Sequence, residues 1–394
     1  MFIARKVQEN MASGFGVRKI FEDGLALKKQ YGEENVFDLS MGNPVMEPPP
    51  AFVKEMLKLS MEPVPGMHRY MPNAGYPETR EAVAKHLSAV TGIGFSSEET
   101  IMTSGTIASL IITFKAIINP GEEIISFAPY FFEYDYFLDN FSGVIKVCPS
   151  DENFIPEFDV FEASINPKTK AVIINSPNNP SGVVYSEQVL IQISDILRRK
   201  SKQYGTPIIV ISDDVYTRII YDGVKCPRIL PHYSDTIVVS SFSKDLSLPG
   251  ERIGYAAVHP DCKYAKDLID ALVYSNRAIY TCAPALQQHL VTNIQDVSIS
   301  MAQYQKNRDF LYSNLTEMGY SVVKPGGAFY MFPRTIGGMD DIAFVKELRQ
   351  FNVLVVPGSS FKSPGHFRIA YCTNDHNIKG CLDGFRKVAQ KFSK

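Results

Sequence analysis

The sequence predicts an α/β fold with a doubly wound, mostly parallel sheet. Three short runs rich in β-branched residues carry this prediction, at 171–175, 207–212 and 236–240, because such runs are typical of buried parallel strands. Segments with helical spacing separate the runs, and this order places helices on both faces of one sheet. Each run ends in polar residues, and ligands bind at the carboxyl ends of the strands in such sheets.

The chain has 394 residues, which is more than one hydrophobic core usually organises. We therefore expect a large domain that carries the sheet over 48–288. A smaller α+β domain is expected to combine the two ends of the chain, 1–47 and 289–394. Three consecutive prolines at 48–50 mark the first boundary, because proline interrupts regular structure.

The remaining elements follow from periodicity and from turn residues. Amphipathic spacing predicts a helix over about 11–31 and another over 51–59. Ser104 is the expected N-cap of a further helix, and one long helix is expected from about 285 to 318. The other short apolar runs predict strands at 36–40, 123–127, 326–332, 352–358 and 366–371.

The composition is that of an ordinary globular protein. The formal net charge is -2 and the hydrophobic content is 45%, so no excess of positive charge favours binding of nucleic acid. No apolar run reaches the length of a membrane span. Six scattered cysteines without a Cys-x-x-Cys pair predict a reduced, cytoplasmic protein, and no cluster of His and Cys predicts a metal site.

Lys244 is the first candidate for chemistry, because it lies just after the run at 236–240. When a lysine is surrounded by small hydroxyl residues and has a second cation nearby, its protonated form is disfavoured and it can act as a nucleophilic amine. This chemistry suggests a Schiff base with a carbonyl compound. Arg252 and Ser241 suggest that the compound carries a phosphate. The alternative is a solvated lysine in a surface loop.

Four other segments offer candidate site residues. The helix start at Ser104 is a ready anion site, or simply a capped helix. Phe131 belongs to an aromatic run that suits stacking on a planar heterocycle or filling of the core. Asp213 ends an apolar strand, where an acid needs a partner. Tyr70 lies in a loop rich in turn formers, which is either functional or an ordinary surface turn.

Taken together, an ordered set of motifs resembles one family, the fold-type I aminotransferases of class I and II, which are aspartate aminotransferase-like and use pyridoxal 5'-phosphate. The resemblance covers about 13–385. It implies transfer of an amino group from an L-amino acid, with aspartate as a candidate, to a 2-oxo acid such as 2-oxoglutarate. The motifs are Gly42-Asn43-Pro44, Tyr70, Ser104-Gly105-Thr106, Asn179-Pro180-Ser181-Gly182, Asp213 with Tyr216, Ser241-x-x-Lys244, Arg252 and Arg368.

The resemblance implies a role for each residue around the cofactor. Lys244 would hold the cofactor as an aldimine and then act as the base at the substrate Cα. Asp213 would pair with the pyridine nitrogen, so that the ring accepts electrons. Asn179 and Tyr216 would bind the phenolic oxygen, and Phe131 would lie against the ring.

The phosphate and the substrate would be bound by further residues of the same motifs. The resemblance assigns the phosphate to Ser104, Gly105, Thr106, Ser241 and Arg252. One departure bears on this site: Glu251 stands where the family often has tryptophan, and its charge would weaken the hold of Arg252 on the phosphate.

The substrate α-carboxylate would bind to Arg368, which forms a bidentate pair that lysine does not copy, with Asn179 and Gly42 beside it. The resemblance also implies a homodimer with shared active sites, in which Tyr70 reaches the site of the partner. Arg277 would read a distal carboxylate across the dimer, which would make aspartate and glutamate substrates. The alternative is a salt-bridged surface arginine.

Four rival functions stand beside the aminotransferase. A carbon-sulfur lyase or an aminocyclopropane-carboxylate-forming enzyme of the same fold would use the same lysine and aspartate. A non-enzymatic regulatory module that binds pyridoxal phosphate would need a DNA-binding domain, and the roughly forty residues before the core carry no helix-turn-helix pattern. A dinucleotide-binding oxidoreductase is disfavoured, because no strand is followed by G-x-G-x-x-G.

Overall fold

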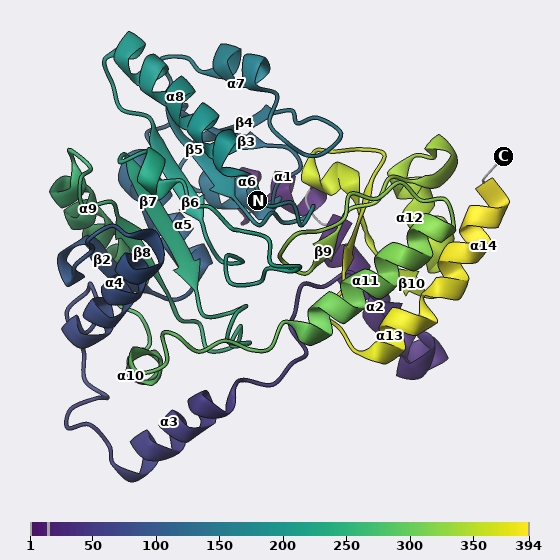
Figure 1. The fold of residues 1–394 in the computed structure, drawn as a ribbon, viewed down its shortest axis with the longest axis horizontal. Helices are drawn as coiled ribbons and strands as arrows, with labels where there is room; N and C mark the ends of the chain where they lie inside the picture. Colours follow the sequence, from purple (N-terminus) through teal and green to yellow (C-terminus); the bar gives the residue numbers. More distant parts are fainter. Residues whose placement is uncertain (1, 14–15, 393–394) are drawn as a thin grey trace.

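The computed structural model describes residues 2–13 and 16–392 (Figure 1). Its main feature is a seven-stranded sheet with the order β2-β8-β7-β6-β5-β3-β4. Strand β8 is antiparallel to both of its neighbours, and the other pairs are parallel. The predicted mostly parallel sheet is thus confirmed. Its strands are β2 (Thr100–Thr103), β3 (Glu123–Phe127), β4 (Val144–Cys148), β5 (Thr169–Asn175), β6 (Ile209–Asp213), β7 (Thr236–Ser241) and β8 (Gly254–Val258).

Hydrophobic side chains project from both faces of this sheet, because successive residues of a strand point to opposite sides. In β6, Val210 packs into the core on one face, and Ile211 packs into the core on the other. Helices therefore cover both faces, as the doubly wound prediction requires. On the first face lie α7 (Phe158–Ser164) and α8 (Glu187–Tyr204). On the second lie α5 (Thr106–Ile117), α6 (Glu133–Asp139) and α9 (Ala265–Ile279).

Both ends of the chain meet in a smaller α+β part, as predicted. Strand β1 (Phe37–Asp38) pairs in parallel with β10 (Val353–Leu354), so the N-terminal segment joins the C-terminal one. The antiparallel strands β11 (Val356–Pro357), β12 (Phe367–Ala370) and β9 (Tyr330–Met331) form a second small sheet. The helices around it are α2 (Gly16–Tyr31), α11 (Ala302–Glu317), α12 (Asp341–Arg349), α13 (Asp375–Gly380) and α14 (Leu382–Phe392), of which α2 lies among the C-terminal helices in Figure 1. The residue limits of the two domains stay a prediction.

One of two long predicted helices differs in the structure. The segment predicted as a helix over 11–31 is helical in the residues that the structure describes, as the end of α1 (Arg5–Ser13) and then α2, and residues 14–15 lie outside the described part. The long helix predicted over 285–318 is wrong, because α10 (Ala285–Thr292) ends well before α11 begins. Between them, Ile294 packs under the large sheet, whereas Ile299 packs into the core of the smaller part. The chain crosses between two cores here, and a continuous helix would not reach both.

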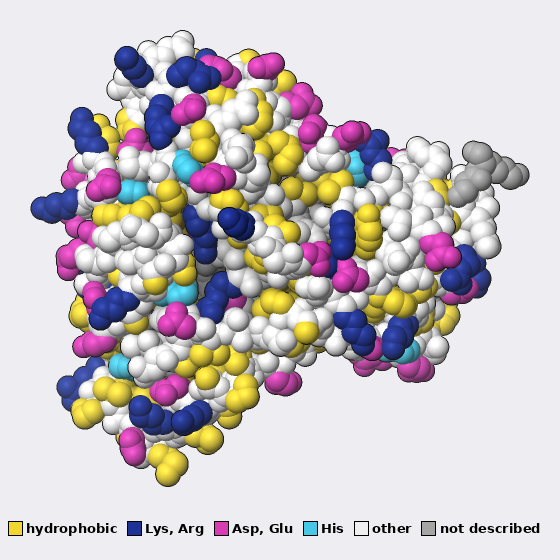
Figure 2. Space-filling model, in the orientation of Figure 1, with side chains coloured by type: hydrophobic (Ala, Val, Ile, Leu, Met, Phe, Trp, Pro, Cys, Tyr) yellow, Lys and Arg dark blue, Asp and Glu magenta, His cyan; other side chains and the backbone are white. Residues whose placement is uncertain are grey.

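The helix that begins at the three prolines has one buried face and one exposed face. One face of α3 (Pro50–Met61) is buried through Phe52 and Leu59 in the core that also contains α4 (Pro77–Thr91) and α10. The other face exposes Val53, Met56, Leu57 and Met61. Figure 1 shows α3 projecting at the lower end of the molecule, and hydrophobic atoms gather there in Figure 2.

Short 3₁₀ helices complete the chain at Glu33–Asn35, Ser97–Glu99, Leu230–His232, Ile336–Gly338 and Gly358–Phe361. All six cysteines are free thiols. None of the helices in the described ranges combines the length and the apolar character needed to cross a membrane.

Candidate active site

A large cavity opens at the carboxyl ends of β5, β6 and β7. Because these strands are parallel and in register, Asn175 lies opposite Asp213 and Asp213 lies opposite Val239, so their terminal side chains meet at one edge. The cavity has a volume of about 370 Å³, which suits a small-molecule site. Of the predicted site residues, it is lined by Gly42, Thr106, Phe131, Asn179, Asp213, Tyr216, Ser241, Lys244, Arg252 and Arg368.

Lys244 lies in the loop after β7, with its amine directed into the cavity. The Nζ atom donates a hydrogen bond of 2.9 Å to the carbonyl oxygen of Gly42. Burial is the largest effect and lowers the pKa of Lys244; Cys372 raises it, the charges of Arg368 and Arg252 lower it further, and Glu133 raises it. The neutral amine is therefore more accessible than in a surface lysine, which is the property that a nucleophile or base needs.

Asp213 ends β6 and is only 5% exposed. Tyr134 donates a hydrogen bond of 2.5 Å to its Oδ2 atom, whereas its Oδ1 atom has no partner within the described residues. Burial raises the pKa of Asp213 to about 7, the bond from Tyr134 lowers it, and the charge of Asp214 raises it. A buried acceptor without a partner needs one from outside the chain, and the protonated ring nitrogen of pyridoxal phosphate fits this position.

The loop after β5 is fastened to the end of β6. Asn175 donates through Nδ2 to the carbonyl oxygen of Asp213 at 3.0 Å, and the backbone N–H of Asn179 donates to Oδ1 of Asn175 at 2.8 Å. These two bonds place the Asn179 side chain at the cavity wall. Its position is set by backbone contacts, so it is a fixed hydrogen-bonding group rather than a mobile loop residue.

Tyr216 follows β6 and closes the cavity where the large sheet meets the smaller part of the molecule, whose core it joins. Its hydroxyl lies 3.1 Å from the hydroxyl of Tyr330, and burial raises its pKa well above the usual value, so it is a neutral hydrogen-bonding group. A Cβ atom added to Gly42 would overlap the hydroxyl of Tyr330. Glycine is thus required where the N-terminal segment approaches this pair.

The start of α5 provides an anion site. The helix begins at Thr106, and its N-cap is Gly105, with φ of 92°, so the prediction of Ser104 as the N-cap is wrong. The Thr106 hydroxyl is buried without a partner within the described residues. Arg252 donates through Nη2 to the carbonyl oxygen of Ser104 at 3.1 Å, and a Cβ on residue 105 would lie 2.8 Å from the same nitrogen. Free amides, a hydroxyl and a guanidinium together fit a phosphate.

Two further residues border this anion site. Ser241, the last residue of β7, lines the cavity beside Arg252. Glu251 accepts a hydrogen bond from Gln287, and no ion pair joins it to Arg252 within the described ranges. The charge of Glu251 is therefore engaged by a neutral partner.

Arg368 is a buried guanidinium on β12, with 4% exposure. It donates through Nη1 to Oδ1 of Asn179 at 3.0 Å and through Nη2 to the carbonyl oxygen of Ser40 at 2.7 Å. The rings of Tyr330 and Phe361 lie 4.7 and 4.9 Å from its central carbon. Neutral acceptors and rings surround it, and the described residues give it no carboxylate partner. A buried charge without a counter-ion is costly, so the site suits an anionic ligand.

Phe131 lines the cavity and also packs against the core beside α5 and α6. Its ring meets that of Tyr134 edge to face, with the centroids 5.6 Å apart. Both interpretations of this aromatic run therefore apply to the same side chain, because one part of the ring fills the core and another faces the cavity.

Four predicted site residues are not among those that line this cavity: Ser104 and Gly105, which adjoin Thr106 in the chain, and Tyr70 and Arg277. Tyr70 is 90% exposed and borders a separate hollow with His68 and Pro284. Arg277 is exposed near the end of α9, and the described residues offer it neither an ion pair nor a hydrogen bond. The suggested salt bridge of Arg277 is thus not formed among the described residues, and a role of Tyr70 or Arg277 across a dimer stays a prediction.

Sequence reasoning missed several residues that shape the site. Tyr134 belongs to the aromatic run that contains Phe131, and Tyr330 lies in the strand predicted at 326–332, but nothing in the sequence indicates which acid or arginine they contact. Ser40 acts through its backbone carbonyl, which leaves no side-chain signal. Glu133 lines the cavity and follows the aromatic residues that drew attention to this segment.

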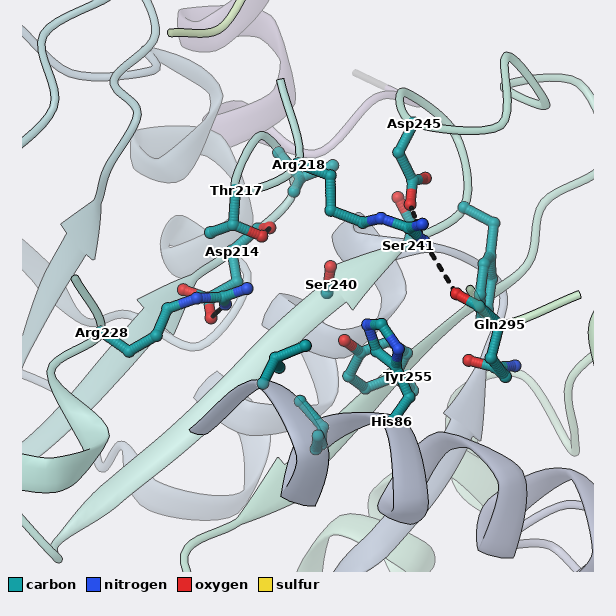
Figure 3. Close-up of a pocket in the computed structure, with 14 residues that line it drawn as sticks. His86, Asp214, Thr217, Arg218, Arg228, Ser240, Ser241, Asp245, Tyr255 and Gln295 are labelled. Atoms are coloured by element: carbon teal, nitrogen blue, oxygen red, sulfur yellow. Dashed lines mark hydrogen bonds and ion pairs between the residues drawn. The ribbon is translucent and has the colours of Figure 1, made fainter. Parts of the chain in front are cut away.

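A second, small cavity lies behind the strand ends and is shown in Figure 3. Arg228 pairs with Asp214 on one side, and Arg218 bonds to Asp245 at 3.1 Å and to the carbonyl oxygen of Gln295 at 2.8 Å on the other. Its enclosed space of about 20 Å³ has room for about one water molecule. This cavity is too small for a substrate, and its ion pairs anchor residues next to Asp213 and Lys244.

The described part of the chain contains no group of three His, Cys, Asp or Glu side chains placed to bind a metal. The cavity instead combines an amine, an open carboxylate, an anion site and a buried guanidinium. This donor set fits pyridoxal phosphate together with the carboxylate of an amino acid.

Comparison with known proteins agrees with this chemistry. The family "Aminotransferase class I and II" matches residues 34–384. A probable aspartate/prephenate aminotransferase of Thermus aquaticus is 33% identical over 359 residues, covering 89% of this chain and 91% of the relative. Aromatic-amino-acid aminotransferase 2 of Thermococcus litoralis is 31% identical over 389 residues, covering 95% of each.

A solved structure of an aminotransferase from Eubacterium rectale superimposes with a TM-score of 0.95 at 39% identity and covers 100% of both chains. The resemblance that the motifs indicated is thereby confirmed. The chain belongs to the class I and II aminotransferases, enzymes that depend on pyridoxal 5'-phosphate.

Proposed function

We propose that the cavity at the ends of β5, β6 and β7 transfers an amino group from an L-amino acid to a 2-oxo acid such as 2-oxoglutarate. The observation that carries this proposal is the meeting of three groups in one cavity: the amine of Lys244, the open Oδ1 of Asp213 and the buried guanidinium of Arg368. Each supplies one requirement of the reaction, namely a base, a partner for the ring nitrogen and a carboxylate receptor.

When bound, pyridoxal phosphate supplies an aldehyde that condenses with amines and a ring that accepts electrons from Cα. Asp213 would hold the proton of the ring nitrogen through its open Oδ1 atom. Asn179 and Tyr216 would bind the phenolic oxygen, and Phe131 would pack against the ring. The phosphate would bind to the N–H groups at the start of α5 and to the side chains of Thr106, Ser241 and Arg252, with Ser104 and Gly105 shaping this loop.

Lys244 provides covalent attachment and proton transfer. Its Nζ atom would attach the cofactor through the aldehyde, with loss of water, and as a free amine it would remove the proton from the substrate Cα. Burial lowers the pKa of Lys244, so that the neutral amine is available for both tasks. The carbonyl oxygen of Gly42 accepts a hydrogen bond from Nζ and keeps the amine in place between its two tasks.

Arg368 orients the substrate. Its guanidinium binds the α-carboxylate as a bidentate pair, and Asn179 and Ser40 hold the guanidinium in position through their hydrogen bonds. This anchor sets the Cα–H bond toward Lys244. Asn179 also borders the carboxylate, because its Oδ1 atom is the acceptor for Arg368.

A homodimer with shared sites is part of this proposal. The apolar face of α3 is exposed in the single chain, and such faces are typical of subunit interfaces. Tyr70 would then complete the phosphate site of the partner. Arg277 would read the distal carboxylate of aspartate there, and its substitution by alanine should impair turnover of aspartate but not of alanine. An equal effect on both donors would remove this role.

The proposal is tested by the cofactor signal and by the need for an acceptor. The purified protein should show a visible absorption band with pyridoxal phosphate, and borohydride should fix the cofactor to the wild type but not to Lys244→Ala. A donor screen with 2-oxoglutarate should give product only when the 2-oxo acid is present. Turnover without any 2-oxo acid would instead indicate the carbon-sulfur lyase. A protein that binds the cofactor without turnover of any donor would be a regulatory module.

A further inference from the structure

Glu133 is an acid in the active-site cavity that the proposed function does not use. It is the first residue of α6 and lines the cavity beside Phe131 and Phe132. Its side chain is half-buried, and the described residues give its carboxylate neither a hydrogen bond nor an ion pair. Every other acid that lines the cavity has a protein contact, since Asp213 accepts a bond from Tyr134.

Among the charged residues that line the cavity, Glu133 is the one to which the proposed function gives no role. The charged residues that line it are Glu133, Asp213, Lys244, Arg252 and Arg368. In the proposed function, Asp213 faces the ring nitrogen, Arg252 the phosphate, Arg368 the substrate α-carboxylate and Lys244 the aldehyde. The cofactor and the α-carboxylate therefore take up all four, and Glu133 remains as a negative charge without a counter-ion.

Glu133 also lies close to the place of the substrate. Its charge interacts with those of Arg368 and Lys244, which mark the two ends of the amino acid that react or bind. Burial raises the pKa of Glu133, and these two cations lower it, so burial outweighs the cations already present. A further positive group would stabilise the carboxylate.

The wall around Glu133 suits an aliphatic side chain. Met41, Ile107, Leu110 and Phe132 line the same cavity, and they add apolar surface to the cavity that holds both Arg368 and the acid. A long side chain with a charged end buries its methylene groups on such surface while its head reaches a polar partner.

We propose that Glu133 binds the positively charged end of the substrate side chain, so that the preferred donor is an L-amino acid with a distal ammonium or guanidinium group. This inference rests on the proposed function, because Arg368 must hold the α-carboxylate. Selectivity arises from attraction to the cation and from repulsion of a second carboxylate, and 2-oxoglutarate meets the same repulsion, so a monocarboxylic 2-oxo acid is expected to be the better acceptor. Aspartate and glutamate are then poorer donors than cationic amino acids, which is the opposite of the distal-carboxylate role proposed for Arg277, so only one of the two roles holds.

The test uses the isosteric variant Glu133→Gln and three carboxylic acids that lack the α-amino group. Desamino-arginine carries a distal guanidinium, hexanoate is neutral and adipate carries a second carboxylate. Their dissociation constants are measured by calorimetry with the cofactor-loaded protein at low ionic strength, where charge effects are least screened. Glu152→Gln is the matched control, because Glu152 is an exposed acid outside the cavity.

We expect the wild type to bind desamino-arginine at least about tenfold more tightly than hexanoate, and adipate least tightly; a tenfold change is about 1.4 kcal/mol. Glu133→Gln should remove this order, and Glu152→Gln should keep it. In turnover, Glu133→Gln should lower kcat/KM for lysine or arginine by a similar factor and raise it for glutamate. An unchanged order in Glu133→Gln, or tightest binding of adipate to the wild type, would overturn the inference.

Arg277 provides a second arm of the test. If the partner's Arg277 neutralised Glu133, a preference for the cation would emerge only in Arg277→Ala, and this result would count against the inference. Failure of the proposed function looks different. In that case hexanoate would bind equally to the wild type and to Arg368→Ala. If instead the affinity for all three acids depended on Arg368 but not on their distal charge, only the role of Glu133 would be rejected.

Discussion

Tyr134 donates its hydroxyl proton to one oxygen of Asp213 and leaves the other oxygen open to the cavity. Tyr134 lies on α6 and Asp213 at the end of β6, so a helix on one face of the sheet orients an acid at its edge. Both side chains are buried. The relationship fixes which oxygen is available to a ligand and keeps a charged form accessible in an apolar setting.

Removal of this hydrogen bond should move the pH dependence of the enzyme. Because the bond from Tyr134 lowers the pKa of Asp213, Tyr134→Phe should raise it. The ring nitrogen needs the ionised acid, so the acidic limb of the kcat profile should shift to higher pH. Tyr185→Phe, a change at a buried tyrosine in a different core cluster, should leave the limb in place. A limb that stays fixed or moves to lower pH in Tyr134→Phe would contradict this role.

The stability of the cofactor-free protein should depend on Asp213 in a defined pH window. The pKa of Asp213 is raised by burial from 3.8 to about 7, so the folded state favours the protonated acid. Stability from this group is present below pH 4 and is lost as the pH rises through 7. Asp213→Asn removes the buried charge and should stabilise the protein at pH 8, by at most about 4 kcal/mol.

Urea unfolding at pH 4 and pH 8 measures this effect. The gain of Asp213→Asn over the wild type should be largest at pH 8 and should vanish near pH 4, where the wild-type acid is also neutral. A difference that is equal at both values would show that the acid keeps its ordinary pKa in the folded protein.

Arginine at position 368 should not be replaceable by lysine. The guanidinium bonds to Asn179 and Ser40 at once and still presents its planar fork to a carboxylate, whereas an ammonium group is a point charge. Arg368→Lys should therefore raise KM for every amino acid by about 10- to 150-fold, the range expected for loss of a charged hydrogen bond. Initial rates with two donors of different side-chain charge check this. A KM effect confined to one donor would assign Arg368 to the side chain instead.

Arg252 and Glu251 are neighbours in the chain with different expected effects on the cofactor. Arg252→Ala should weaken the affinity for pyridoxal phosphate by about tenfold or more, because a charged hydrogen bond to the phosphate is lost. Glu251 is engaged by Gln287, so Glu251→Gln should leave the affinity nearly unchanged. Titration of the visible band measures both. A clearly tighter complex in Glu251→Gln would show that this acid weakens the phosphate site.

The local chemistry of this protein was readable in its sequence. Short apolar runs that end in polar residues predict parallel strands with a common reactive edge, and this pattern places Asp213 and Lys244 at the same edge of the sheet. Hydrophobic periodicity acts over a few residues, so it is visible without knowledge of the fold. The motifs around Gly105, Asn179 and Arg368 were recognisable for the same reason, because each lies within one short segment.

Tertiary structure alone decided which distant groups meet. The chain leaves α10 to carry Ile294 and Ile299 into two different cores, and no glycine or proline announces this break. Tyr134 donates a hydrogen bond to Asp213, Tyr330 packs on Arg368, and Glu133 has no partner among the described residues, because strands and helices far apart in the chain converge at one edge. Such contacts depend on relative placement in space, and the residue type at a single position does not encode it.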